Sequence, residues 1–261
     1  MRSRKSTYAR VSSRKHLEGR ARAGVRKLCT MDEKCVVVFD CECDTGFGEV
    51  FGCARDEIIE RFMQFTCICA LLIPTRVLAQ NVPADEVIQQ SKRMTWWRDV
   101  STDKRSTPVD SLLELFDEAE LIVGFNCLAF DFRLIRRFYG NSAMSVNRYI
   151  QHRSKCLDIM TRVRDVTEDY FKLDKLLKDN GLSAKTGDGS LAIAMWQQGQ
   201  RDELESYCAS DVELTARLGL LDSMRVVQKC KINAIVLPEC AYGLRSALRC
   251  KAPLDASVSR C

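Results

Sequence analysis

Two acidic residues stand two positions apart at the end of an apolar segment. Asp40 and Glu42 follow residues 34–39, whose β-branched run predicts a buried strand. Side chains two apart on a strand point to the same face, so both carboxylates lie on one side. Two adjacent negative charges are unfavourable unless a cation neutralises them, so the pair indicates a divalent metal site. A D-x-E sequence by itself is weak evidence, because in most proteins it represents two solvated surface acids.

A third acidic residue, Asp131, opens a predicted helix shortly after a buried strand. The strand covers residues 121–125, and Phe130 and Phe132 give the acid an apolar setting. An acid in the first turn of a helix is also favoured by the helix dipole. For Asp131 alone, both a capping role and a chemical role remain open.

A fourth acidic residue, Asp211, shares a helix face with Tyr207. The two are four positions apart, and leucines occupy the rest of that stripe. Burying a carboxylate among leucines costs free energy unless the carboxylate has a partner. The pair therefore indicates either a functional site or a hydrogen bond between Tyr207 and Asp211 inside the core.

In this order, the acidic residues and their neighbours resemble the motifs of the DEDD exonuclease superfamily, in its tyrosine subgroup. The residues that match its three motifs are Asp40 and Glu42, then Asn126, Phe130 and Asp131, and finally Tyr207 and Asp211. The strings are similar to the exonuclease domains of family B DNA polymerases and to stand-alone relatives of that domain. The resemblance spans roughly residues 34–222.

The resemblance implies an α/β fold of the ribonuclease H-like kind, a mixed sheet flanked by helices. It implies 3′→5′ hydrolysis of single-stranded or frayed nucleic-acid ends, with DNA favoured over RNA. Two Mg²⁺ or Mn²⁺ ions would be held by four carboxylates, those of Asp40, Glu42, Asp131 and Asp211. Hard oxygen ligands without histidine favour these ions over zinc.

The same resemblance assigns roles to the remaining motif residues. Tyr207 would orient the attacking water, and Asn126 and Phe130 would contact the substrate or support the site. A catalytically inactive module that only binds nucleic acid is the alternative. A structural scaffold would neither bind nor cleave nucleic acid.

The elements that position these residues follow from the apolar pattern. Strands are predicted at 34–39, 62–73, 121–125 and, briefly, 156–160; helices are predicted at 110–119, 130–139, 172–180, 190–198 and 201–226. Strands come first and then alternate with helices, which predicts a layered α/β domain. Residues 44–57 resemble a hairpin-like loop, and residues 75–108 a polar insertion.

Positive charge is concentrated at the N-terminus. Residues 1–28 hold ten Lys and Arg and one acid, while the rest of the chain is mildly acidic. This basic arm would bind phosphate groups, act as a nuclear or organelle-targeting segment, or remain a solvated tail. The exonuclease domain is expected over 29–230, with a C-terminal extension over 231–261. No apolar run reaches the ~18 residues of a membrane span.

The cysteine and histidine content limits which metal sites and catalytic nucleophiles the chain can form. The chain has 14 cysteines but no C-x-x-C pair, so we expect buried, reduced thiols in an intracellular protein rather than a zinc site. It has only two histidines, His16 in the arm and His152 in a polar stretch that we expect at the surface. Catalysis by a histidine-activated nucleophile is therefore poorly supported.

Two adjacent tryptophans, Trp96 and Trp97, lie among basic residues. Such mixtures occur in proteins that bind single strands by base stacking. A surface loop with one tryptophan directed inward is the more favoured interpretation.

Overall fold

The structure is a computed structural model. It describes residues 33–49, 52–98, 109–183, 187, 189–228 and 234–249, all within one compact unit, Glu33–Cys261. The predicted basic arm and the predicted domain boundary near residue 230 lie outside these residues, so both stay predictions. Among the described helices, none combines the length and the apolar character needed to cross a membrane.

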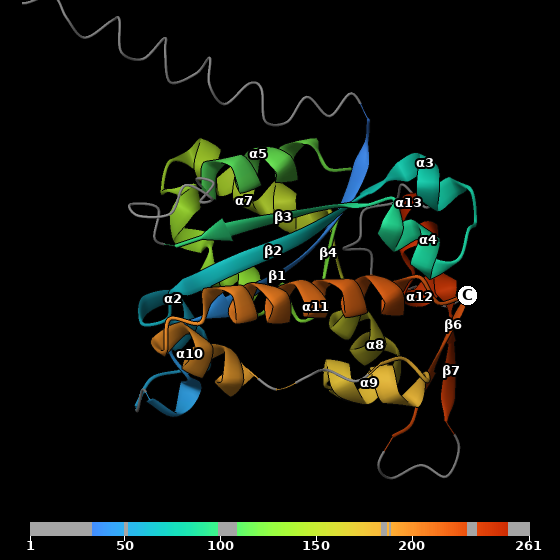
Figure 1. Ribbon diagram of the computed structural model, residues 1–261. Helices are drawn as coiled ribbons and strands as arrows, with labels where there is room; N and C mark the ends of the chain where they lie inside the picture. The colour runs from blue at the N-terminus through green and yellow to red at the C-terminus, as the bar shows by residue number, and fades with distance from the viewer. Residues whose placement is uncertain are drawn as a thin grey trace, which may run out of the picture. The chain divides into compact units, whose positions relative to one another are not determined.

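A five-stranded mixed sheet forms the centre of the fold, in the order β3-β2-β1-β4-β5 (Figure 1). Its strands are β1 (Cys35–Cys43), β2 (Phe65–Pro74), β3 (Lys92–Trp97), β4 (Leu121–Gly124) and β5 (Cys156–Asp158). Strand β2 is antiparallel to β1 and β3, whereas β4 runs parallel to β1 and β5 parallel to β4. The predicted mixed sheet flanked by helices is confirmed.

The central strand, β1, is buried on both faces. Its alternate side chains therefore pack against helices on opposite sides of the sheet. Val36 and Val38 join the core that includes the long helix α11 (Arg201–Gly219). Phe39 points the opposite way, with its ring 4.9 Å from that of Phe116 on α5 (Val109–Glu118). The alternation places Asp40 and Glu42 at the carboxyl end of β1 on the face covered by α11.

Helices cover both faces of this sheet. α11 contacts β1 and β2 along its length, and α10 (Gly189–Gln197) contacts the start of α11 and β1. Figure 1 shows α11 lying along the sheet, with α5 and α7 (Ala143–Ser154) on the other side. The short helices α6 (Asp131–Leu134) and η2 (Arg136–Tyr139) follow β4. Asp131 and Asp211 therefore approach the sheet from different helices.

The remaining elements complete the core around the sheet. They are η1 (Phe47–Glu49), α2 (Arg55–Arg61), α3 (Thr75–Ala79), α4 (Ala84–Gln89), α8 (Ile159–Thr167), α9 (Leu173–Asp179), β6 (Ser223–Val226), β7 (Ile235–Pro238), α12 (Glu239–Tyr242) and α13 (Leu244–Arg249). Strands β6 and β7 form a separate two-stranded sheet. Leu237, Tyr242 and Leu244 are buried in the same core as Leu218 of α11. The C-terminal segment thus packs onto the central domain.

Several predicted boundaries were wrong. Residues 75–98 are not a polar insertion but form α3, α4 and the edge strand β3, which pairs with β2 from Lys92 to Trp97. Residues 55–61 form α2, which overlaps the end of the predicted loop 44–57, and β2 begins at Phe65 rather than at residue 62. The predicted helix 201–226 ends at Gly219, because residues 223–226 pair with β7. The predicted helix 130–139 is divided into α6 and η2.

Gly124 ends β4, and its backbone lies close to the side chain of Cys127 in the turn that follows. An added Cβ would lie 2.6 Å from Cys127 Cβ and 2.7 Å from Cys127 Sγ, with Phe39 O at 3.3 Å. Cys127 is fully buried and cannot move into solvent. Glycine is therefore needed here because of the close approach.

Substituting Gly124→Ala is expected to lower the free energy of unfolding by about 1–3 kcal/mol, the usual cost of overpacking a core. Thermal unfolding measures the effect. Gly48→Ala is the matched control, because nothing lies within 4 Å of a Cβ at that exposed glycine. Equal unfolding temperatures for the two variants would show that the turn at Cys127 relaxes without cost.

Candidate metal centre

The carboxylates of Asp40 and Glu42 lie together at the end of β1. One carboxylate oxygen from each and the sulfur of Cys208 all lie within 4.8 Å of one another. Glu42 is only 8% exposed, and Asp40 is half-buried. The Cys208 thiol donates to Asp40 O at 3.5 Å and lies 3.9 Å from Asp40 Oδ2. This contact joins α11 to the strand end that carries the two acids.

Asp131 reaches the same strand end from α6. Its Oδ1 accepts a hydrogen bond of 2.8 Å from the backbone N–H of Cys41, the residue between Asp40 and Glu42. The side chain is 2% exposed, and burial, with a contribution from the charge of Asp158, raises the pKa of Asp131 to about 7. A buried carboxylate beside other acids is stabilised in its charged form by a cation.

The raised pKa of Asp131 predicts a pH dependence for the metal-free protein. A group whose pKa is higher when folded than when unfolded stabilises the fold at low pH, and that contribution is lost as pH rises through the folded value. With a pKa near 7 against an ordinary value of 3.8, the unfolding free energy should fall as the pH rises from about 4 to about 7, by roughly 1 kcal/mol per pH unit, and level off above about pH 8. Urea unfolding in a chelator measures this change, and Asp131→Asn should remove it. An unchanged slope in Asp131→Asn would assign the pH dependence to other groups.

Tyr207 and Asp211 lie one turn apart on α11, and each is 4% exposed. They flank Cys208 on the helix that contacts β1 and β2. Within the described residues, the group around Asp40 and Glu42 includes neither Asp131 nor Asp211. The structure therefore joins Asp40 with Glu42, ties Asp131 to the same strand end, and places Asp211 on the helix that covers it.

The donor set of these residues suits a hard divalent cation. The four acids offer carboxylate oxygens from β1, α6 and α11, and three of them are buried. Oxygen ligands match Mg²⁺ and Mn²⁺, which also retain water molecules in their coordination shells. The sulfur of Cys208 is a soft ligand and does not match these ions.

Asn126 and Phe130 lie in the loop between β4 and α6. Asn126 has a left-handed backbone (φ 62°), and its N–H donates to Asp158 Oδ1 at 2.9 Å. The Leu128 N–H donates to the other carboxylate oxygen of Asp158 at 3.0 Å. The half-buried ring of Phe130 lies 6.2 Å from that of Phe47. Asp158 thus holds the loop that leads to Asp131.

Asp158 supports the loop of the candidate site, and the sequence analysis missed it. It is 2% exposed, and besides the loop it caps α8 by accepting from the Thr161 N–H at 3.2 Å. Burial raises the pKa of Asp158, and the three N–H donors oppose that rise. An acid between a short strand and a helix is an N-cap signal, but its bonds to a distant loop leave no local pattern.

Asp158→Ala is expected to cost roughly 2–4 kcal/mol of unfolding free energy, because two loop N–H groups lose their acceptor in addition to the helix cap. Ser142→Ala is the control, because Ser142 caps only α7, by accepting from Ser145 N–H, and should cost ~1 kcal/mol. Urea denaturation compares the two variants. Equal losses would mean that Asp158 acts only as a helix cap.

The predicted surface position of His152 is wrong. Its ring is buried, with Nδ1 2.8 Å from Tyr139 Oη and Nε2 2.7 Å from Asp117 Oδ1. Burial lowers the pKa of His152. Its ring also packs against Phe116, on the face of the sheet opposite Asp40 and Glu42. His152 is therefore a hydrogen-bonded core residue.

The tryptophan pair is also buried, against the expectation of a loop. Trp96 donates its indole N–H to Ser111 Oγ at 2.9 Å, and Trp97 joins the core under α11. Neither ring offers a face for base stacking. The partly exposed aromatic ring nearby is Trp196, which lies 3.9 Å from the Arg201 guanidinium carbon.

Comparisons with known proteins give a family and a structural neighbour. The family model described as the RNase_H superfamily matches residues 86–221, more than half of the chain, a range that contains Asp131 and Asp211. No curated protein sequence matches. A solved family B DNA polymerase from the hyperthermophilic archaeon Pyrobaculum calidifontis is 14% identical, with a TM-score of 0.44. The match covers 71% of this chain and 24% of the polymerase, so this chain spans about a quarter of that length.

Proposed function

Because this chain belongs to the RNase H superfamily, we propose that it is a metal-dependent 3′→5′ exonuclease. The observation that carries the proposal is the hydrogen bond from Cys41 N–H to Asp131. This bond brings Asp131, which opens α6 after β4, to the end of β1 that carries Asp40 and Glu42. Separate parts of the chain thereby contribute carboxylates to one place, as a site for divalent cations requires.

In this proposal, two Mg²⁺ or Mn²⁺ ions are held by carboxylate oxygens, those of Asp40, Glu42, Asp131 and Asp211. Bound divalent ions supply a water of lowered pKa and stabilise the negative charge that develops on the leaving 3′ oxygen. Asp40 and Glu42 present their carboxylates from one rigid strand. Asp131 is held in place by the Cys41 N–H, so it does not have to reorganise when substrate binds.

The side chains around the carboxylates would bind and orient the substrate. Tyr207 offers a hydroxyl on the same face as Asp211 and orients the attacking water. Asn126 and Phe130 contact the 3′-terminal nucleotide from a loop that Asp158 fixes at two N–H groups. The substrate is a single-stranded or frayed 3′ end, with DNA favoured over RNA.

The proposal is tested with single-stranded DNA and RNA of the same sequence, each labelled at the 5′ end. With Mg²⁺ or Mn²⁺ we expect a ladder that shortens by single nucleotides from the 3′ end, faster for DNA. A chelator should stop the reaction, and a blocked 3′ end or a circular strand should resist it.

The competing functions give different results in the same assay. A catalytically inactive nucleic-acid-binding module would retain the labelled strand in a filter-binding measurement without shortening it in any metal. Cleavage of the circular strand would identify an endonuclease. Either result would overturn the proposed 3′→5′ exonuclease activity.

A further inference from the structure

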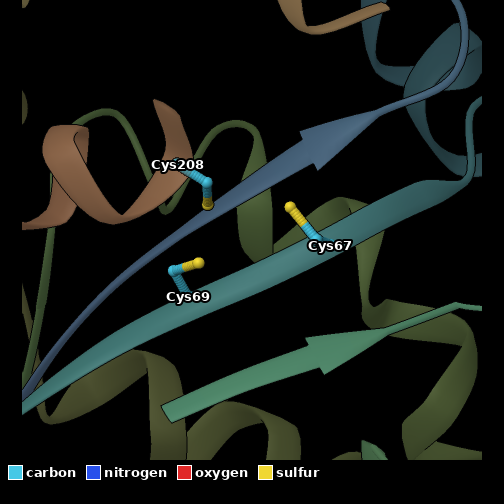
Figure 2. Close-up of side chains that lie close together, drawn as sticks. All are labelled: Cys67, Cys69 and Cys208. Atoms are coloured by element: carbon cyan, nitrogen blue, oxygen red, sulfur yellow. The ribbon is translucent and has the colours of Figure 1, made fainter. Parts of the chain in front are cut away.

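Three buried cysteines converge between the sheet and α11. Cys67 and Cys69 come from β2 and Cys208 from α11, and their sulfur atoms all lie within 4.8 Å of one another. Figure 2 shows the three side chains directed into the same space from the two elements. The proposed exonuclease activity does not use Cys67 or Cys69.

Strand alternation and register produce this convergence. Cys67 and Cys69 are two apart on β2, so both face α11, and Cys69 pairs directly with Asp40 on β1. Cys208 lies on α11, which covers this face of the sheet, and its thiol contacts Asp40. All three cysteines are at most 2% exposed. Cys67 and Cys69 therefore lie one strand further across the sheet than the two carboxylates, whereas the Cys208 sulfur also lies within 4.8 Å of carboxylate oxygens of Asp40 and Glu42.

The spacing suits three sulfur ligands around one ion. A metal–thiolate bond of ~2.3 Å places three sulfurs in a trigonal arrangement roughly 4 Å apart. The observed separations, all within 4.8 Å, allow this geometry after small side-chain rotations. Two buried thiols, Cys127 and Cys156, also meet elsewhere in the core, but only Cys67, Cys69 and Cys208 bring three sulfurs together among the described residues.

Cys69 has polar neighbours on β3 and α11. Its sulfur lies 3.7 Å from Thr95 Oγ1 and 3.8 Å from the backbone oxygen of Glu205. The Thr95 hydroxyl donates to Glu205 Oε1 at 2.9 Å, which fixes its orientation. In the metal-free protein these contacts fix the position of the Cys69 thiol, whose S–H donates to the Glu205 backbone oxygen.

We propose that Cys67, Cys69 and Cys208 form a binding site for one soft, thiophilic cation of the Cu(I) type. Thiolate ligands select soft ions, whereas the carboxylates of Asp40 and Glu42 select hard ones. Among the described residues, this group holds three sulfurs and no fourth His, Cys, Asp or Glu, which suits Cu(I) better than zinc, since zinc takes four ligands in structural sites. Each thiol that binds as a thiolate releases its proton to solvent, and no electron is transferred. The site shares no proposed ligand with the carboxylate centre, although Cys208 contacts Asp40, and its test does not depend on nuclease activity.

The test uses the full chain in a background variant that keeps only the buried cysteines of the described residues. The residues changed to serine are the partly exposed Cys43 and Cys53, the exposed Cys240, and Cys29, Cys230, Cys250 and Cys261, which lie outside the described residues. The reduced protein is titrated anaerobically with Cu(I), with excess Mg²⁺ present and a colorimetric Cu(I) chelator as competitor. X-ray absorption at the copper edge then counts the sulfur ligands. We expect a bound Cu(I) with three sulfur ligands.

Two variants from different elements localise the ion. Cys208→Ser on α11 and Cys67→Ser on β2 should each lose one equivalent of tightly bound Cu(I). Cys127→Ser is the matched control, because Cys127 is also fully buried but pairs with Cys156, with the sulfurs 3.3 Å apart. This control should keep the three-sulfur signal.

Either of two results would overturn the site. One is a background variant whose copper spectrum shows only two sulfurs or none. The other is an unchanged Cu(I) equivalence in both Cys208→Ser and Cys67→Ser. The copper spectrum of the background variant needs no further substitution, so it decides the question even if both variants fail to fold.

Discussion

Replacing Asp40 with Asn and Glu42 with Gln together is expected to abolish metal-dependent cleavage while the protein keeps its fold. The amides keep the shape of the side chains but remove two negative charges from the strand end. Metal binding contributes several kcal/mol of transition-state stabilisation, so the loss should reach ~10³-fold or more. Single-turnover cleavage of a 5′-labelled DNA strand in Mg²⁺ measures the change.

The same double variant should unfold in chelator at the wild-type urea concentration or higher. In the metal-free protein, Asp40 and Glu42 repel each other, and the nearby Asp131 carboxylate adds to this repulsion. Active sites commonly retain such costs, which substitution relieves. Asp110→Asn with Glu114→Gln, an exposed pair on α5, makes the same change of charge and is the control. Wild-type cleavage by the Asp40 and Glu42 double variant would show that these acids are not the metal ligands.

Local sequence patterns predicted the parts of the site that depend on one element. The alternation in β1 placed Asp40 and Glu42 on one face because a central strand keeps a period of two. The spacing of Tyr207 and Asp211 likewise required only the helical repeat. The hydrogen bond from Cys41 to Asp131 spans 90 residues of sequence, so no local pattern contains it.

Positions whose burial depends on distant neighbours were predicted less well. His152 has charged and polar sequence neighbours, yet it is buried because Tyr139 and Asp117 satisfy both ring nitrogens. Trp97 and the rest of β3 resembled an insertion because Lys92 and Arg93 are exposed on an edge strand. The end of α11 at Gly219 depends on β7, which pairs with residues 223–226.

The cysteine cluster, too, could be predicted only in part from local sequence. The C-x-C spacing of Cys67 and Cys69 correctly predicted a shared face, and with no C-x-x-C pair the sequence favoured inert thiols. The third sulfur comes from α11, 139 residues after Cys69 along the printed sequence. Only the packing of α11 across β1 and β2 brings Cys208 to the pair.

Tyr207→Phe is expected to slow cleavage by roughly 10–10³-fold without weakening metal binding, because only the hydroxyl that orients the water is lost. The ring can stay packed, since it lies in the core under α11. Asp211→Asn should cost more, because it removes a charged metal ligand from the same helix face. Mn²⁺ binding, followed by the magnetic resonance signal of the free ion, should weaken only in Asp211→Asn.

The double variant Tyr207→Phe with Asp211→Asn distinguishes a shared catalytic role from two independent ones. Groups that serve the same water give effects that do not add, so the double variant should be little slower than Asp211→Asn alone. Single-turnover cleavage by both single variants and the double variant completes this cycle. Phe138, an exposed aromatic residue on η2, provides a control through Phe138→Leu, which should cleave at the wild-type rate. If Tyr207→Phe also matches wild type while Asp211→Asn is inactive, the tyrosine is a packing residue. The water must then be oriented by the carboxylates alone.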